Sequence, residues 1–164
     1  MIWIYIVGFI VVFIGASAFF GAPYVPSRRR DMRRMFDTLY PLSKEDVVFD
    51  AGSGDGVILR EVSRRGASAV GYEINPIFWA ISKFLSNGYK RISIKLANFW
   101  IEPFPDDVTL IYAFTVTRDG KRLLKKLRRE RERLGRPFTI VCYGSPLPGV
   151  APTKSYEAYN LYEF

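Results

Sequence analysis

A short glycine-rich segment carries the residue types best suited to chemistry. It follows the apolar run Val47–Phe49, precedes a predicted helix, and consists of Asp50, Ala51, Gly52, Ser53, Gly54, Asp55 and Gly56. Gly52 and Gly54 would let the backbone turn sharply and approach a ligand closely. The spacing is G-x-G-x-G, whereas dinucleotide-binding folds use G-x-G-x-x-G. Because a pyrophosphate would be repelled by Asp50 and Asp55, these acids indicate a cationic ligand instead.

A second acid lies where a nucleoside ligand would need it. Glu73 ends the next predicted strand, 17 residues after Gly56. A carboxylate there can accept hydrogen bonds from both hydroxyls of a ribose. Each feature alone is weak, because strand-end acids often act as caps and glycine-rich turns are common. Together, and in this order, they favour S-adenosylmethionine (SAM), whose amino group Asp50 can hold directly or through water. We therefore expect SAM as the cofactor.

Alternating apolar and helical patterns predict the elements that carry these residues. Strands are expected at residues 47–49, 67–72, 92–96, 108–113 and 138–143, helices at 28–39, 57–65, 76–85 and 119–134, and a terminal strand or hairpin at 156–164. Strands that alternate with helices indicate an α/β fold with a mainly parallel sheet covered on both faces.

Composition limits the chemistry. The 164 residues include no histidine and one cysteine, Cys142. A histidine-based acid–base mechanism, a Ser-His-Asp triad, an internal disulfide and a Cys-rich metal site are therefore excluded, and no metal is expected. The net charge of +8 suits an anionic partner, either nucleic acid or anionic lipid, although it also serves solubility alone.

The first 22 residues contain no charge and are expected to form a membrane anchor. As a helix they would span about 33 Å, enough for the bilayer core. The cluster Arg28–Arg30 follows directly, which predicts a single-pass protein with its catalytic domain on the cytoplasmic or matrix-like side. A signal peptide cleaved near Ala16–Ala18 and a buried core helix are the alternatives, but no basic residue precedes the apolar run. The expected organisation is anchor 1–22, joint and short helix 23–41, and catalytic domain 42–164.

The segment Asp50–Gly56 followed by Glu73 resembles the cofactor motifs of class I SAM-dependent methyltransferases. The resemblance implies a Rossmann-like three-layer sandwich whose seven-stranded sheet has an antiparallel last strand. It also implies that Glu73 and Ile74 belong to the cofactor site and that Asn98 meets the adenine amino group. Phe99 or Trp100 would pack near the adenine ring, and the other would join the core.

A narrower resemblance covers nearly the whole chain. The apolar segment, the element Pro23–Ser27 and the compact core are similar to the small membrane-anchored protein-lysine methyltransferases of mitochondria and their prokaryotic relatives. Mitochondrial members of that group modify the ATP synthase c subunit and the adenine nucleotide translocase. The resemblance implies methyl transfer to a lysine of a membrane or membrane-associated protein. It further implies that Tyr24, Pro26 and Ser27 contact SAM or the substrate, although X-Pro pairs also suit a stiff linker.

Methyl transfer from SAM requires alignment and exclusion of water, and no catalytic base is obligatory. A dry site near the sulfonium would lower the pKa of the acceptor lysine. Tyr112, Tyr24 and Phe114 are the candidates for an aromatic mouth that positions this lysine by cation–π contact. The sequence Tyr112–Thr117 lacks the Asn-Pro-Pro-Tyr motif of base aminomethylases, and it contains no cysteine for covalent attack on cytosine.

The predicted helix at residues 119–134 is strongly basic. Its cations form a solvated outer face, a surface for anionic lipid, or a surface for RNA. Two rival functions therefore stay open. One is an RNA or lipophilic small-molecule methyltransferase, and the other is a non-catalytic SAM-binding membrane module.

Overall fold

The computed structural model describes residues 2–5, 8 and 29–164. Most of the predicted anchor lies outside the described residues, and so do Tyr24, Pro26 and Ser27. Within the described ranges, no helix has the length and apolar character needed to cross a membrane.

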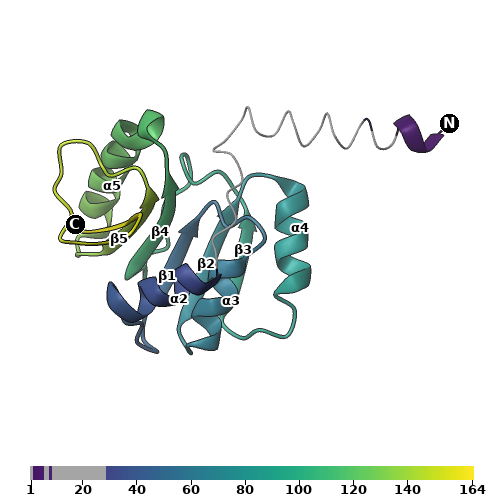
Figure 1. Ribbon diagram of the computed structural model, residues 1–164, viewed down its shortest axis with the longest axis horizontal. Helices are drawn as coiled ribbons and strands as arrows, with labels where there is room; N and C mark the ends of the chain where they lie inside the picture. The colour runs from purple at the N-terminus through teal and green to yellow at the C-terminus, as the bar shows by residue number, and fades with distance from the viewer. Residues whose placement is uncertain (1, 6–7, 9–28) are drawn as a thin grey trace.

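A seven-stranded sheet forms the centre of the domain (Figure 1). The strands are β1 (Val47–Ala51), β2 (Ser68–Glu73), β3 (Ile92–Leu96), β4 (Leu110–Thr115), β5 (Thr139–Gly144), β6 (Lys154–Tyr156) and β7 (Tyr159–Glu163). Their order is β3-β2-β1-β4-β5-β7-β6. The first five strands pair in parallel, and β7 pairs antiparallel with β5. The implied antiparallel last strand is thereby confirmed, and the chain ends in a hairpin.

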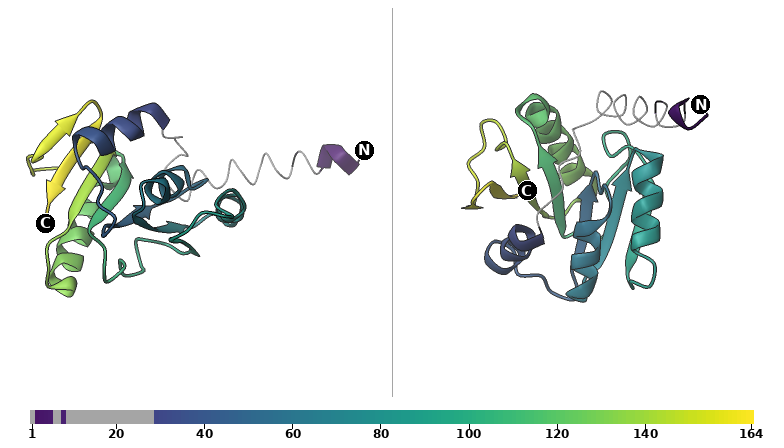
Figure 2. Two further views of the ribbon diagram at one scale, coloured as in Figure 1. Left: turned by 90° about the horizontal axis from the view of Figure 1, so that it is seen from below. Right: turned by 45° about the vertical axis from the view of Figure 1, so that its right-hand side comes forward.

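Helices cover both faces of this sheet. They are α2 (Arg29–Thr38), α3 (Val57–Arg64), α4 (Pro76–Leu85) and α5 (Gly120–Leu134), the last preceded by a 3₁₀ turn (Thr117–Asp119). The two further views place α2 and α5 on opposite sides of the sheet (Figure 2). α4 packs against the edge strand β3 and its neighbour β2. The three-layer arrangement expected from the sequence is therefore present.

Two apolar clusters hold the layers together, one on each face. Val48 of β1 lies in the cluster that includes α2 and α3, whereas its neighbour Phe49 lies in the cluster that includes α5. Successive strand residues point to opposite faces, so a strand buried on both sides must be apolar throughout. α2 contributes Met32, Met35 and Phe36, which recur at the three- and four-residue spacing of a helix face.

Element boundaries differ slightly from the sequence expectations. β4 begins at Leu110 rather than at residue 108, because the Val108 N–H donates to Pro105 O (3.3 Å) and closes a turn there. β1 continues through Asp50 and Ala51, since both residues pair with β2 and β4. The acid that ends the apolar run is thus part of the strand itself.

Candidate active site

The segment between β1 and α3 turns directly over the end of β2. The backbone N–H groups of Gly52 and Ser53 both donate to Tyr72 O at 3.0 Å. Gly52 has a φ of 99°, a left-handed conformation that favours glycine. A Cβ at this position would meet no atom within 4 Å, so the backbone here borders open space.

The end of this segment packs tightly against α4. Gly56 also has a positive φ, of 79°, and a Cβ on it would overlap Ser82 Oγ in the middle of α4. Ser82 is fully buried. A glycine at position 56 is therefore required both by the backbone conformation and by the close approach of the second helix.

Glu73 ties the two loops of the site together. Its Oε2 accepts a hydrogen bond from the Gly54 N–H, and its Oε1 accepts one from the Asn75 N–H, each at 2.8 Å. The carboxylate is buried. Each of its oxygens has a second lone pair, so both can still accept from the hydroxyls of a ribose. The structure thus places the predicted ribose acid directly beside the glycine-rich segment.

Asp50 is a buried acid that lacks a partner. It is 3% exposed, and no donor in the described part of the chain lies within hydrogen-bond distance of its carboxylate. Burial, together with the nearby charges of Glu73 and Asp55, raises the pKa of Asp50 well above its usual value. A cationic ligand would relieve this repulsion and supply the missing hydrogen bonds. The site therefore fits the ammonium and sulfonium charges of SAM.

Asp55 has a partner that sequence reasoning missed. The Arg60 guanidinium donates to Asp55 Oδ2 (3.4 Å) and to Asp55 O. Arg60 is buried at the start of α3, one turn after Gly56. Asp55 lies outside α3, so this contact does not follow the i,i+3 or i,i+4 spacing of a helix face, and no signal in the sequence indicates it. Because Arg60 offsets the charge of Asp55, Asp50 is the better candidate for contact with a cation.

The loop after β3 completes this edge of the sheet. The Ala97 N–H donates to Glu73 O (2.9 Å), and Asn98 Oδ1 accepts from the Trp100 N–H (3.0 Å). The rings of Phe99 and Trp100 are half-buried with centroids 4.3 Å apart. Parallel strands present their carboxyl ends, and hence ligand sites, at one edge. Asn98 and Phe99 are accordingly near Glu73, and their assignment to adenine stays a prediction.

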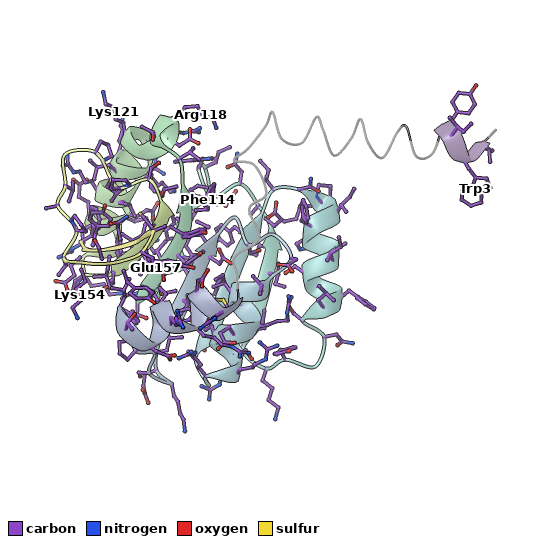
Figure 3. The ribbon with its side chains drawn as sticks, viewed as in Figure 1. Trp3, Phe114, Arg118, Lys121, Lys154 and Glu157 are labelled. Carbon is purple, nitrogen blue, oxygen red and sulfur yellow. The ribbon has the colours of Figure 1, made fainter. Side chains whose placement is uncertain are left out.

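The positions of Tyr112 and Phe114 support the proposed aromatic mouth only in part. Tyr112 is 3% exposed and lies in the core cluster that includes α2 and α3. Its predicted contact with substrate therefore stays a hypothesis for a residue that the folded chain buries. Phe114, labelled in Figure 3, is half-buried at the end of β4 with its ring 5.8 Å from that of Tyr143. Ile74 is exposed beside Glu73.

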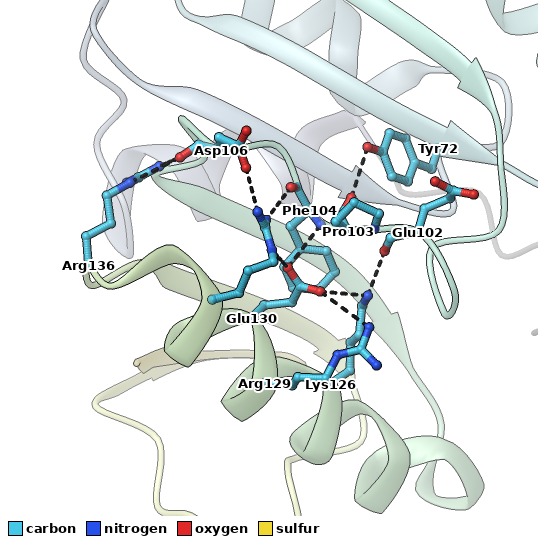
Figure 4. Close-up of polar contacts among 10 residues, drawn as sticks. Tyr72, Glu102, Pro103, Phe104, Asp106, Lys126, Arg129, Glu130 and Arg136 are labelled. Carbon is cyan, nitrogen blue, oxygen red and sulfur yellow. Dashed lines mark hydrogen bonds and ion pairs between the residues drawn. The ribbon is translucent and has the colours of Figure 1, made fainter.

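A buried charge network fixes α5 to the loop after β3 (Figure 4). Glu130 accepts from Lys126 Nζ (2.8 Å), from Arg133 Nε (2.7 Å) and from the Phe104 N–H (3.2 Å). Lys126 also donates to Glu102 O at 2.6 Å. Hydrogen bonds outweigh burial here and hold the pKa of Glu130 below its usual value. One side of the basic helix is thus structural, which its i,i+4 Lys–Glu spacing could have indicated.

The remaining cations of α5 face outward. Lys121, Lys125 and Arg128 line a surface groove with Leu124 and Pro148. Arg122 lies over the Trp100 ring at 4.3 Å, so it contacts the loop beside the candidate site. Across residues 29–164 and the short described stretch before them, no group of acidic or cysteine side chains is arranged to hold a metal ion.

Comparison with known proteins identifies relatives of this chain. No protein-family model matches it. It is 34% identical over 113 residues to a protein-lysine N-methyltransferase of Saccharolobus islandicus (strain REY15A), a match that covers 66% of this chain and 69% of that protein. It is 28% identical to the lysine N-methyltransferase of the ATP synthase c subunit from Xenopus laevis, with 79% of this chain and 56% of that protein covered.

Solved structures show the same fold. An RNA methyltransferase from Salinibacter ruber, solved in complex with S-adenosyl-L-homocysteine, superimposes with a TM-score of 0.71. The match covers 85% of this chain and 92% of that one at 21% identity. Coclaurine N-methyltransferase superimposes with a TM-score of 0.59 at 14% identity, covering 70% of this chain and 35% of the other. The Rossmann-like methyltransferase fold is therefore shared by enzymes with very different acceptors.

Proposed function

Because this chain belongs to the family of protein-lysine N-methyltransferases, we propose that it transfers a methyl group from SAM to a lysine of a membrane or membrane-associated protein. The observation that carries the proposal is the Asp50 carboxylate, which is buried beside Glu73 and the glycine-rich segment and has no partner among the residues that the structure describes. A cationic nucleoside matches this combination of charge and backbone geometry.

We assign each residue of the site to a different part of the cofactor. Asp50 would hold the amino group, Glu73 the ribose hydroxyls, and Asn98 the adenine amino group, with Phe99 against the ring. The open backbone at Gly52 leaves room for the methionyl portion. When bound, SAM supplies an electrophilic methyl group on a sulfonium centre. The chain's task is then to position the acceptor and to exclude water.

The acceptor lysine must reach this site as a neutral amine. Its nitrogen lone pair would form the new N–C bond while the S–C bond breaks, and the bonding electron pair would stay on sulfur. The methylated nitrogen would then be cationic and would release a proton to solvent. The chain contains no histidine to accept that proton. A partly dry entrance beside a cation would lower the pKa of the lysine. Phe114, half-buried near the end of β4, is the residue that we assign to that entrance.

Two features support a protein acceptor at a membrane. The Xenopus laevis relative is named for a lysine of the ATP synthase c subunit. The first 22 residues of this chain carry no charge, and three arginines follow at positions 28–30. A single-pass anchor with the domain on the cytoplasmic or matrix-like side would keep the site close to membrane proteins.

Methyl-labelled SAM tests the proposal directly. The full chain would be incubated with the membrane proteins, soluble proteins and RNA of its source cell. We expect label in a membrane protein, retained after nuclease and recovered as methyllysine on hydrolysis. Label in RNA or in extractable lipid would keep the fold and overturn the acceptor. Binding of SAM without transfer to any fraction would favour a non-catalytic module.

Glu73 provides the matched variants for this experiment. Glu73→Ala should weaken SAM binding by about tenfold to a hundredfold, because it removes charge-assisted hydrogen bonds. Glu73→Gln retains the shape and should lie between Glu73→Ala and the native chain. Glu132→Ala, an exposed acid on α5, serves as the control and should bind SAM normally. Equal binding by all three variants would contradict the cofactor assignment.

Because burial and the nearby acids raise the pKa of Asp50 in the free protein, SAM binding should release a proton at pH values below that raised pKa. The free protein favours protonated Asp50, whereas a cationic ligand favours the carboxylate. Affinity should therefore rise with pH up to the raised pKa and be constant above it. Calorimetry in buffers of different ionisation enthalpy would measure the proton. Asp50→Asn should remove the pH dependence, and an unchanged dependence would assign the proton elsewhere.

A further inference from the structure

α4 is apolar on every side although it lies at the edge of the domain. Its ten residues carry one charge, Lys83. The inner side packs on the sheet, where Trp79 joins the core and its Nε1 donates to Ile94 O (3.3 Å). A helix that is hydrophobic all round normally has cover on both sides. The sheet covers only the inner side of α4.

The other side presents a continuous apolar stripe to the exterior. We call it the outer face of α4, and it consists of Ile74, Ile77, Ile81, Phe84 and Leu85. All five residues are exposed, and Phe84 is 79% exposed. At 3.6 residues per turn these positions fall within an arc of about 100°. A contiguous exposed patch of this kind marks an interaction surface rather than scattered surface residues.

The charge of the surrounding segment favours an anionic partner. Residues 74–101 hold four cations, namely Lys83, Lys90, Arg91 and Lys95, and no acid. Lys83 is exposed on α4 itself and lies over the Trp79 ring at 5.5 Å. Apolar and aromatic residues accompanied by lysines are typical of helices that lie in the interface of an anionic bilayer. A protein partner recognised by charge would instead be expected to find acids as well as cations.

The described part of the N-terminal segment does not cover this face. Ile2, Trp3, Ile4 and Tyr5 are each more than 70% exposed, so they pack neither on α4 nor on the core. The chain thus carries two exposed apolar regions far apart in sequence.

We propose that the outer face of α4 docks in the headgroup region of an anionic membrane. This inference rests on the proposed location of the enzyme at a membrane. The inference adds a specific orientation of the domain relative to the membrane. Asn75 Oδ1 caps α4 by accepting from the Ile77 N–H (2.9 Å), and the Asn75 N–H donates to Glu73. The start of α4 is therefore part of the cofactor site. Docking through α4 would bring that site to the lipid–water boundary, where lysines of membrane proteins emerge.

Site-specific labels on the full chain test the orientation. Phe84→Cys on α4 and Lys154→Cys on β6 would each carry an environment-sensitive fluorophore, since both positions are exposed. Lys154 lies far from α4 in Figure 3. The native Cys142 is fully buried and should not react. The proteins would be reconstituted with phosphatidylcholine vesicles, with or without phosphatidylglycerol, that contain headgroup-level nitroxide quenchers. SAM affinity is measured in parallel.

Quenching at position 84 should be several-fold stronger than at position 154, and stronger with anionic lipid. Equal quenching at both positions in a protein that floats with vesicles would overturn docking through α4 and leave the anchor intact. Shielding of position 84 without lipid, increasing with protein concentration, would assign the face to a second copy of the chain. Failure to float with vesicles would overturn every membrane contact, whereas normal SAM affinity would leave the methyltransferase proposal standing.

Discussion

α4 and α5 lie against the same sheet and differ in what they bury. α5 is rich in charge, yet its Lys126 and Glu130 are buried and satisfied by hydrogen bonds. α4 is rich in apolar residues, yet five side chains in and beside it are exposed. Buried polar groups and exposed apolar patches are the informative departures from ordinary burial. The contrast shows that residue type alone does not decide which helix serves stability and which serves recognition.

The difference lies in whether each unusual residue has a partner within the fold. Glu130 has three donors, and every one of them comes from α5 or from the loop after β3. The outer face of α4 has no comparable cover in the residues that the structure describes. A substitution in the Glu130 network of α5 should therefore lower the free energy of unfolding, whereas a substitution on the outer face of α4 should weaken binding to the membrane.

The largest effect is expected from Glu130→Ala on α5. Glu130 is 0% exposed, and its loss would leave Lys126 as an uncompensated buried charge. Breaking a buried ion pair in this way costs about 3–5 kcal/mol in the free energy of unfolding. Urea unfolding followed by circular dichroism would measure it. The exposed Glu132→Ala should change the free energy by less than about 0.5 kcal/mol. A similar small loss for Glu130→Ala would show that the network is not structural.

A smaller effect on the free energy of unfolding is expected when the pH is lowered. The pKa of Glu130 is lowered in the folded chain, so its contribution to stability is complete above the unfolded pKa of about 4.3 and is lost as pH falls through the folded pKa. Each unit of pKa difference corresponds to about 1.4 kcal/mol. Unfolding free energies measured between pH 7 and pH 3 should therefore fall less steeply in Glu130→Gln than in the native chain. Parallel curves would exclude Glu130 as the titrating group.

The smallest effect on stability is expected from Phe84→Ala on α4. This large aromatic side chain is 79% exposed, so its removal should change the free energy of unfolding by less than about 0.5 kcal/mol. Leu127→Ala on α5 removes a fully buried side chain and should cost about 2–5 kcal/mol. Comparable losses in the two variants would mean that Phe84 packs against the fold, and the contrast between the helices would not hold.

Local patterns predicted the elements that the structure contains. The helix at 76–85 and the strand at 92–96 were located without error, because proline starts the helix and alternation marks the strand. The proximity of Asp50 and Glu73 also followed, since both acids lie near the carboxyl ends of neighbouring parallel strands. The Arg60–Asp55 contact and the burial of Tyr112 did not follow. The first depends on the conformation of the turn before α3, and the second depends on how α2 packs against the sheet.

The exposure of one side of α4 likewise could not be predicted from the sequence. The pattern of Ile77, Ile81 and Phe84 indicates a helix face, and such a face normally meets the core. Only the position of α4 at the edge of the sheet shows that it points outward. The charge network of α5 was similarly hidden, because its partners Glu102 and Phe104 lie in a loop without periodicity.

The overlap that a side chain at position 56 would make with Ser82 links these regions mechanically. The helix proposed to lie on the membrane and the turn proposed to cradle the cofactor touch with no room between them. If α4 lies on a bilayer, the turn that carries the cofactor residues is therefore held beside that surface through this contact.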